Sequence, residues 1–229
     1  MIFLQFLAVI IVGYLIGSIP SGVLVSKLIS KVDIREYGSG KIGATNVLRT
    51  AGTKAAAFVL FLDIVKGALA VVFAGLIVGR NYLVIGGDFG LGLLVAQVLA
   101  GLAAIAGHNW SIFLGFKGGR GVATFFGGLV ALCPVAALFG GEVFIIGAGL
   151  TRFASLGSIA GVVGTYSILI PLTIFNGFPL EYLIYTLIGT VVIVVMHREN
   201  IARLLSGKER RLGEKAKPVE SELSKEVAE

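Results

Sequence analysis

The chain has 229 residues, of which 56% are hydrophobic and only 14% are charged, and its formal net charge is +6. Soluble domains carry about 25% charged residues, so this composition excludes an ordinary soluble domain and predicts an all-α fold, a polytopic membrane helix bundle. The basic excess does not indicate nucleic acid binding, because the basic residues lie in loops and a tail between or after apolar segments.

Seven apolar segments are candidates for transmembrane helices. Crossing about 30 Å of hydrocarbon takes roughly 20 apolar residues. The predicted seven transmembrane helices are, in chain order, residues 2–26, 55–79, 91–107, 121–133, 135–150, 157–175 and 180–196. The fourth and fifth are short and meet at Cys133-Pro134, so a re-entrant pair is the alternative to two full spans. No basic residue precedes Lys27, which favours a retained first helix over a signal peptide.

The basic residues predict the orientation. With seven spans, the loops 31–54, 108–120 and 151–156 share one side with the tail 197–229, and this side receives nearly all of the 19 Lys and Arg residues. The opposite side receives Arg80 alone. By the positive-inside rule, the N-terminus is outside and the C-terminus is cytoplasmic.

Two domains are expected from hydrophobicity. Residues 1–205 form the transmembrane domain. Residues 206–229 are polar and charged, too poor in apolar residues to build a core, and are expected to be a disordered cytoplasmic tail without an assigned function.

The first cytoplasmic loop has the composition of a phosphate site. It reads Gly38-Ser39-Gly40-Lys41-Ile42-Gly43-Ala44-Thr45-Asn46, and Arg49 follows. Glycines let backbone N–H groups approach an anion closely, and successive N–H groups in a turn form an anion-binding nest. A helix that starts here would add its dipole. A flexible polar loop is the alternative interpretation.

The second cytoplasmic loop repeats this composition. It reads Gly115-Phe116-Lys117-Gly118-Gly119-Arg120-Gly121-Val122-Ala123-Thr124. Interfacial snorkelling would explain the charges of Lys117 and Arg120, but not the glycines around them. We therefore expect both loops to bind phosphate groups.

Further polar residues lie at the ends of predicted spans or inside one of them. Ser155 precedes the sixth span, and His197 and Asn200 follow the seventh on one helical face. Asp63 and Lys66 lie inside the second span, where opposite charges are costly unless paired, so we interpret them as a structural charge pair, with substrate contact as the alternative. His108 is expected to be an interfacial structural residue. Clustered carboxylates for a metal are missing from the sequence pattern, so neither a metal nor a cofactor is expected.

These residues together resemble the bacterial membrane acyl-phosphate:glycerol-3-phosphate acyltransferase family. The resemblance rests on motifs spread in family order from about residue 13 to 205. The matching stretches are Gly17–Gly22, Gly38–Gly40, Gly43–Asn46, Asp63–Gly67, Gly107–Asn109, Phe116–Gly121, Ser155-Leu156 and His197–Ile201. The family commonly has Lys where this chain has Arg120. Arg keeps the positive charge but replaces a compact ammonium group with a planar guanidinium group.

The resemblance implies an enzyme of phospholipid synthesis in the bacterial inner membrane, with its active site facing the cytoplasm. Its substrates would be acyl phosphate and glycerol 3-phosphate, and its products 1-acyl-glycerol 3-phosphate (lysophosphatidic acid) and phosphate. A transporter of a phosphorylated solute is the alternative from the residues alone.

The resemblance also implies roles for matching residues. Ser39, with backbone N–H groups near Gly40 and Gly43, would bind the head of acyl phosphate. Glycerol 3-phosphate would be held by Arg49, Lys117, Ser155, His197 and Asn200. The proton acceptor would be either His197, whose ordinary pKa near 6.5 suits neutral pH, or a phosphate oxygen of the substrate.

Overall fold

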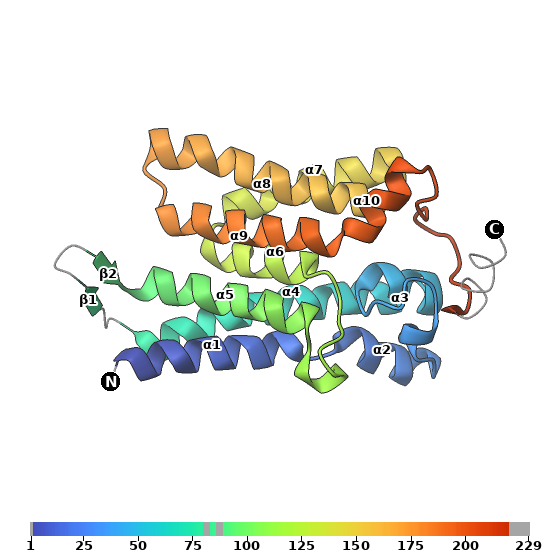
Figure 1. The fold of residues 1–229 in the computed structure, drawn as a ribbon, viewed down its shortest axis with the longest axis horizontal. Coiled ribbons are helices and arrows are strands. Elements are labelled where there is room, and N and C mark those ends of the chain that lie inside the picture. Colours follow the sequence, from blue (N-terminus) through green and yellow to red (C-terminus); the bar gives the residue numbers. More distant parts are fainter. Residues whose placement is uncertain (1, 80–82, 86–88, 220–229) are drawn as a thin grey trace.

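The structure is a computed structural model that describes residues 2–79, 83–85 and 89–219. Over these residues it is a helical bundle whose long helices run side by side, with one short hairpin at the end near the N-terminus (Figure 1). Arg80 and residues 220–229 of the expected tail lie outside the described residues.

The first predicted span is broken into two helices. Helix α1 covers Ile2–Ser18 and α2 covers Ser21–Ser30, with Pro20 between them. A proline disfavours helical backbone at the residue before it and cannot donate a backbone hydrogen bond. The break places α2 at the end of the bundle opposite the N-terminus (Figure 1).

The remaining elements follow the predicted order with several additions. Short elements that the sequence did not predict are a 3-10 turn η1 at Ile34–Glu36 and a β-hairpin of β1 (Leu83–Ile85) and β2 (Phe89–Leu91). The helix considered after the first glycine loop is present as α3, Ala44–Ala51. A second 3-10 turn, η2, covers Ile112–Leu114. The other helices are α4 Thr53–Val78, α5 Leu93–Asn109, α6 Val122–Leu132, α7 Pro134–Thr151, α8 Ala154–Asn176, α9 Leu180–Met196 and α10 Arg198–Leu205.

The described helices support a multi-pass membrane protein. By length and apolar composition, four segments can cross a membrane, namely α4, α7, α8 and the pair α1 and α2 counted as one, and a fifth can if the bent pair α9 and α10 is one span. Helices α5 and α6 are apolar but shorter, and α6 has 11 residues. An apolar helix therefore lies at each of the seven predicted positions, while the number of crossings stays a prediction.

Glycines allow the helices to pack closely. A Cβ on Gly67 of α4 would meet the Thr124 carbonyl oxygen of α6, and a Cβ on Gly127 of α6 would meet the Ile64 carbonyl oxygen of α4. Small residues of this kind let helix backbones approach in a membrane, where van der Waals packing drives association. This contact fixes α4 against α6 beside the site described below.

The polar loops gather at one end of the bundle. Helices α2, α3 and α10 lie at the end away from the hairpin, and the chain between α5 and α6 returns on the same side (Figure 1). The residues after α10 also differ from the disordered tail expected. Residues 208–218, hereafter the strap, cross this end and form backbone hydrogen bonds to it, from Leu212 to Arg152 (2.7 Å) and from Ala216 to Arg49 (3.1 Å).

Candidate active site

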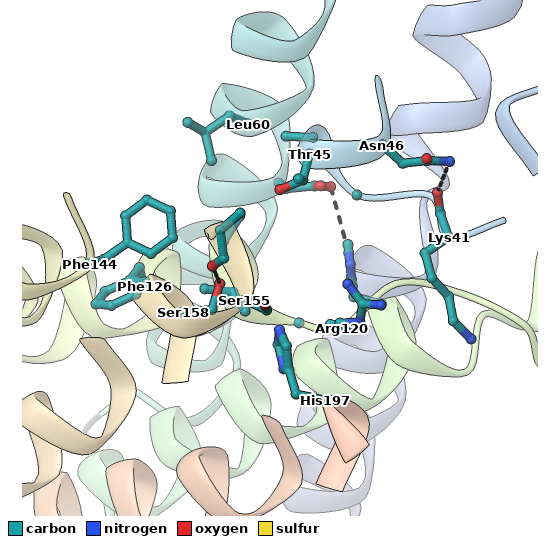
Figure 2. Close-up of a pocket in the computed structure, with 18 of the residues that line it drawn as sticks. Lys41, Thr45, Asn46, Leu60, Arg120, Phe126, Phe144, Ser155, Ser158 and His197 are labelled. Carbon is teal, nitrogen blue, oxygen red and sulfur yellow. Dashed lines mark hydrogen bonds and ion pairs between the residues drawn. The ribbon is translucent and has the colours of Figure 1, made fainter. Parts of the chain in front are cut away.

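A cavity of about 380 Å³ opens at the polar end of the bundle. Its polar wall is contributed by both glycine loops, the starts of α3 and α8, the α9–α10 junction and the strap. The polar residues are Ser39, Lys41, Thr45, Asn46, Arg49, Asp63, His108, Arg120, Ser155, Ser158, His197, Asn200 and Glu209. Residues far apart in the sequence are thus brought to one pocket, and the two predicted loops share it, as Lys41 of the first and Arg120 of the second illustrate (Figure 2).

Asn46 holds the first loop in shape. Its side-chain oxygen accepts a hydrogen bond from the backbone N–H of Ser39 (3.1 Å), and its amide nitrogen donates to the carbonyl oxygens of Ile34 (2.9 Å), Tyr37 (3.0 Å) and Lys41 (2.9 Å). The bond to Lys41 is drawn in Figure 2. Because the amide is occupied by the loop and 2% exposed, Asn46 acts as a structural bracket.

The backbone donors of the first loop differ from the nest expected. The N–H of Gly38 donates to the strap carbonyl of Lys217 (2.8 Å), and that of Gly40 donates to Tyr37 (3.0 Å). Gly43, in contrast, is the residue before α3, and the first N–H groups of a helix have no acceptor within it. Gly43 and Thr45 line the cavity, so the start of α3 is the backbone anion site that this loop offers.

Two half-buried arginines with a buried Nε atom face the cavity. Arg49 comes from α3 and Arg120 from the second loop, and the Nε of each is buried without a hydrogen-bond partner among the described residues. Burial, and then repulsion by Arg203, lowers the pKa of Arg120 to about 10, and burial, then repulsion by Arg210, lowers that of Arg49. Both remain cations at neutral pH, and a half-buried cation with an unused Nε donor is suited to bind an anion.

The second loop divides its predicted residues between two places. Arg120 and Gly121 line the main cavity. Lys117 and Gly118 instead line a neighbouring cavity of about 320 Å³ beside Asp33 and Arg35. Gly119 packs where a Cβ would meet the His108 ring, and its N–H donates to the His108 carbonyl (3.0 Å). The cation that this loop supplies to the main cavity is therefore Arg120 rather than Lys117.

A carboxylate of the strap joins the predicted polar residues. Glu209 Oε1 accepts hydrogen bonds from Ser155 Oγ and Asn200 Nδ2, both 2.7 Å, and Oε2 pairs with Arg203 Nε at 2.9 Å. Burial raises the pKa of Glu209, but these hydrogen bonds outweigh burial and hold the pKa below its usual value. Sequence analysis missed Glu209, because a lone acidic residue in a polar tail carries no local signal.

His197 lies between α9 and α10 and is 2% exposed. Its Nδ1 lies 2.8 Å from the Ile193 carbonyl oxygen. A carbonyl can only accept, so Nδ1 carries the hydrogen and Nε2 is left with its lone pair. Arg120 lies close enough to His197 to repel a positive charge on its ring, so protonation of the ring would be unfavourable.

Asp63 and Lys66 form the expected pair, and His108 completes it. Lys66 Nζ lies 2.8 Å from Asp63 Oδ1 and 2.8 Å from His108 Nδ1, and it donates to the Ile19 carbonyl at 3.2 Å. Asp63 and His108 reach the cavity wall. His108 is thus a buried member of this cluster and not the interfacial residue expected, because α5 packs beside α4.

The rest of the cavity is apolar. Below the polar wall it continues between α4, α6 and α7. This part is lined by Leu60, Ile64, Val122, Phe126, Val130, Ala137, Gly141, Phe144 and Ile145. Figure 2 places Phe126 and Phe144 on one side and Arg120 with Lys41 on the other. One cavity therefore offers cations at one end and an apolar groove at the other, which suits a ligand with a phosphate head and a fatty chain.

Comparisons with known proteins agree with this arrangement. A family model described as glycerol-3-phosphate acyltransferase matches residues 7–207. "Glycerol-3-phosphate acyltransferase 3" of Dehalococcoides mccartyi is 64% identical over 217 residues, which cover 95% of this chain and all of that relative. "Glycerol-3-phosphate acyltransferase" of Halalkalibacterium halodurans is 44% identical over 206 residues, covering 90% of this chain and 95% of the relative.

Two solved structures share the fold. Both are crystal structures of PlsY (YgiH), an integral membrane glycerol 3-phosphate acyltransferase, 36% identical in sequence. The glycerol 3-phosphate form has a TM-score of 0.78 and the alignment covers 91% of this chain and 96% of that one. The lysophosphatidic acid form has a TM-score of 0.76, with 91% and 95% covered.

Proposed function

We propose the following reaction for this chain, which belongs to the glycerol-3-phosphate acyltransferase family. The 1-hydroxyl oxygen of glycerol 3-phosphate attacks the carbonyl carbon of an acyl phosphate. An ester bond forms, the bond from the acyl carbon to the phosphate oxygen breaks, and 1-acyl-glycerol 3-phosphate and phosphate leave. Acyl transfer to glycerol 3-phosphate follows from the family, and the acyl-phosphate donor is the proposed part.

The half-buried guanidinium groups of Arg49 and Arg120, each with an unpartnered Nε, lie in one cavity and carry this proposal. Both proposed substrates are phosphate esters or anhydrides, and guanidinium groups bind phosphate oxygens with paired hydrogen bonds. Acyl phosphate is an activated anhydride, so direct attack requires positioning of the two substrates rather than a covalent enzyme intermediate.

Roles follow from the lining residues. Ser39 and the N–H groups at the start of α3 bind the phosphate of acyl phosphate. Arg49, Arg120, Ser155, His197 and Asn200 hold glycerol 3-phosphate, with Arg120 taking the place that the sequence suggested for Lys117. The predicted glycines divide into Gly43 and Gly121, which line the cavity, and Gly38, Gly40, Gly118 and Gly119, which shape the loops.

The proton of the attacking hydroxyl passes to the phosphate of the donor. A phosphate oxygen is present wherever acyl phosphate binds, whereas protonation of His197 would place a cation beside Arg120. His197 instead orients glycerol 3-phosphate through Nε2. The Asp63–Lys66–His108 cluster is a structural support for the cavity wall.

We further propose seven crossings, with the N-terminus outside, the C-terminus in the cytoplasm, and the cavity open to the cytoplasm at the inner membrane. The catalytic unit comprises residues 1–205 together with the strap. The excess of basic residues in the loops at the cavity end supports this orientation.

The test is a two-substrate assay with the purified full-length protein in detergent. Palmitoyl phosphate and glycerol 3-phosphate together should release phosphate and form lysophosphatidic acid, and either substrate alone should not. Replacement of palmitoyl phosphate by palmitoyl-CoA should abolish product. Product from palmitoyl-CoA at an equal rate would contradict the proposed donor.

A further inference from the structure

Gly141 of α7 lines the apolar part of the cavity, although glycine is a poor residue for a helix interior. A glycine there costs roughly 0.5–1 kcal/mol relative to alanine. Several other helix glycines of this bundle are explained by close packing. A Cβ on the adjacent Gly140 would meet Thr165 Oγ1 and would lie 2.9 Å from the Gly161 carbonyl oxygen.

Packing does not explain Gly141. A Cβ built on Gly141 meets nothing within 4 Å among the described residues. Ala137, Phe144 and Ile145, about one turn before and after it on the same face of α7, also line the cavity, so a side chain on this face would take up cavity space. The missing side chain therefore widens the groove rather than letting two helices touch.

The position of Gly141 along the groove is set by Phe126. A Cβ on Gly140 would lie 3.0 Å from the Phe126 ring, and Phe126 lies four residues, about 6 Å, beyond Val122 at the polar start of α6. Gly141 is thus about one helical turn or more away from Arg120, and it lines the apolar part of the cavity rather than its cationic end.

The groove is open at its side as well as at its polar end. Leu60 of α4, Val130 of α6 and Ile145 of α7 line it and are 44%, 48% and 67% exposed. Exposed apolar side chains in a membrane helix face lipid, so a long chain can lie partly in the groove and partly in the bilayer.

We propose that Gly141 determines which acyl chains this enzyme accepts, by leaving room at the middle of the groove for a long fatty chain. The inference rests on the proposed function, because it takes the groove as the site of the acyl group. A side chain at position 141 would shorten the groove and favour donors whose chain ends before it.

The test is a competition between donors. Purified full-length wild-type protein and the variants Gly141→Ala, Gly141→Val and Gly141→Leu are given octanoyl and palmitoyl phosphate in one tube with glycerol 3-phosphate. Mass spectrometry gives the ratio of the two lysophosphatidic acids, and this ratio does not depend on how much protein is folded.

The ratio of octanoyl to palmitoyl product should rise along the series and change by about tenfold or more for Gly141→Leu, because a single methylene in an apolar pocket changes selectivity by about 10–200-fold. Gly149→Leu is the matched control. Gly149 lies on the same helix, its Cβ would also meet nothing within 4 Å, and it does not line the cavity. This control should keep the wild-type ratio.

A wild-type ratio in the Gly141 variants, or an equal change in Gly149→Leu, would overturn the inference. If Gly141→Leu does not fold, the Ala and Val variants decide the question by the same ratio. Failure of the wild type to form either product would instead refute the proposed function, so the two failures are distinguishable.

Discussion

Arg120 and Lys117 belong to one loop, yet they line different cavities. Hydrogen bonds to charged groups are worth about 1.5–3 kcal/mol, so we expect Arg120→Ala to lower kcat/KM for glycerol 3-phosphate by roughly 10–100-fold. Arg120→Lys should recover most of this loss, because Lys keeps the charge. Steady-state kinetics with Lys117→Ala provides the comparison, and a larger loss for Lys117→Ala than for Arg120→Ala would contradict the assignment.

The lone pair on His197 Nε2 can either orient glycerol 3-phosphate or accept its proton, and kinetics can separate these two roles. If His197 orients glycerol 3-phosphate and the donor phosphate takes the proton, His197→Gln should raise KM for glycerol 3-phosphate while kcat falls by less than about tenfold. Loss of a general base typically costs about 10²–10⁴-fold in rate. A fall of that size in kcat at saturating substrate would identify His197 as the base.

Among the elements, the strap has the most direct link to the cavity. Arg49 Nη2 donates to the strap carbonyl of Arg210 (3.1 Å), and Glu209 holds Ser155 and Asn200. We expect a chain ending after Gly207 to lose at least about tenfold in kcat/KM, because two or more hydrogen bonds to site residues disappear. A chain ending after Val219 should keep wild-type kinetics. Equal activity of both truncations would show that the strap is dispensable.

Glu209 should also give the strap a pH dependence. Its carboxylate is held below the usual pKa by hydrogen bonds from Asn200, Ser155 and Arg203 that outweigh burial. A depressed pKa contributes stability that is present above the unfolded pKa and is lost as the pH falls through the folded pKa. Wild-type protein should therefore have a higher Tm than Glu209→Gln near neutral pH. This difference should shrink in acid, whereas a constant difference would contradict the ionic contribution.

The contact between α4 and α6 predicts a stability effect away from the polar residues. A methyl group on Gly67 would collide with the Thr124 carbonyl, and overpacking typically costs about 1–3 kcal/mol. Gly67→Ala should therefore lower the Tm in detergent. Gly75→Ala on the same helix is the control, because its Cβ would lie 3.7 Å from its nearest neighbours, and its Tm should be unchanged or higher.

Periodicity and charge predict the helices of this fold well, but not its tertiary details. The apolar segments that form α4, α8 and α9 are each long enough to be recognised as a helix from the sequence. Asn46 belongs to a loop expected to bind phosphate, but its side-chain NH2 group donates to three carbonyl groups of its own loop. Such a bracket depends on how the loop folds back, which local sequence does not encode. The same applies to His108 of α5, whose contact with Lys66 of α4 depends on how these two helices pack.

At the scale of the whole molecule, orientation in the membrane is the main prediction. Cys133 is the only cysteine in the sequence and is 3% exposed, so single cysteines can be added to the natural chain. A membrane-impermeant maleimide on intact cells should label Asn176→Cys and should label Lys54→Cys only after permeabilisation. The reverse pattern would contradict a cytoplasmic cavity. Unmodified protein, with Cys133 alone, measures the background.

The strap is attached largely through peptide groups. The N–H of Ala216 donates to the Arg49 carbonyl, and the N–H of Gly38 donates to that of Lys217. Backbone hydrogen bonds of this kind constrain the length of the strap and its path across the bundle. They place no constraint on the identity of most of its side chains. Substitutions in the strap other than at Glu209 should therefore be harmless in relatives, while a one-residue deletion between 212 and 216 should be as damaging as the loss of an arginine from the cavity.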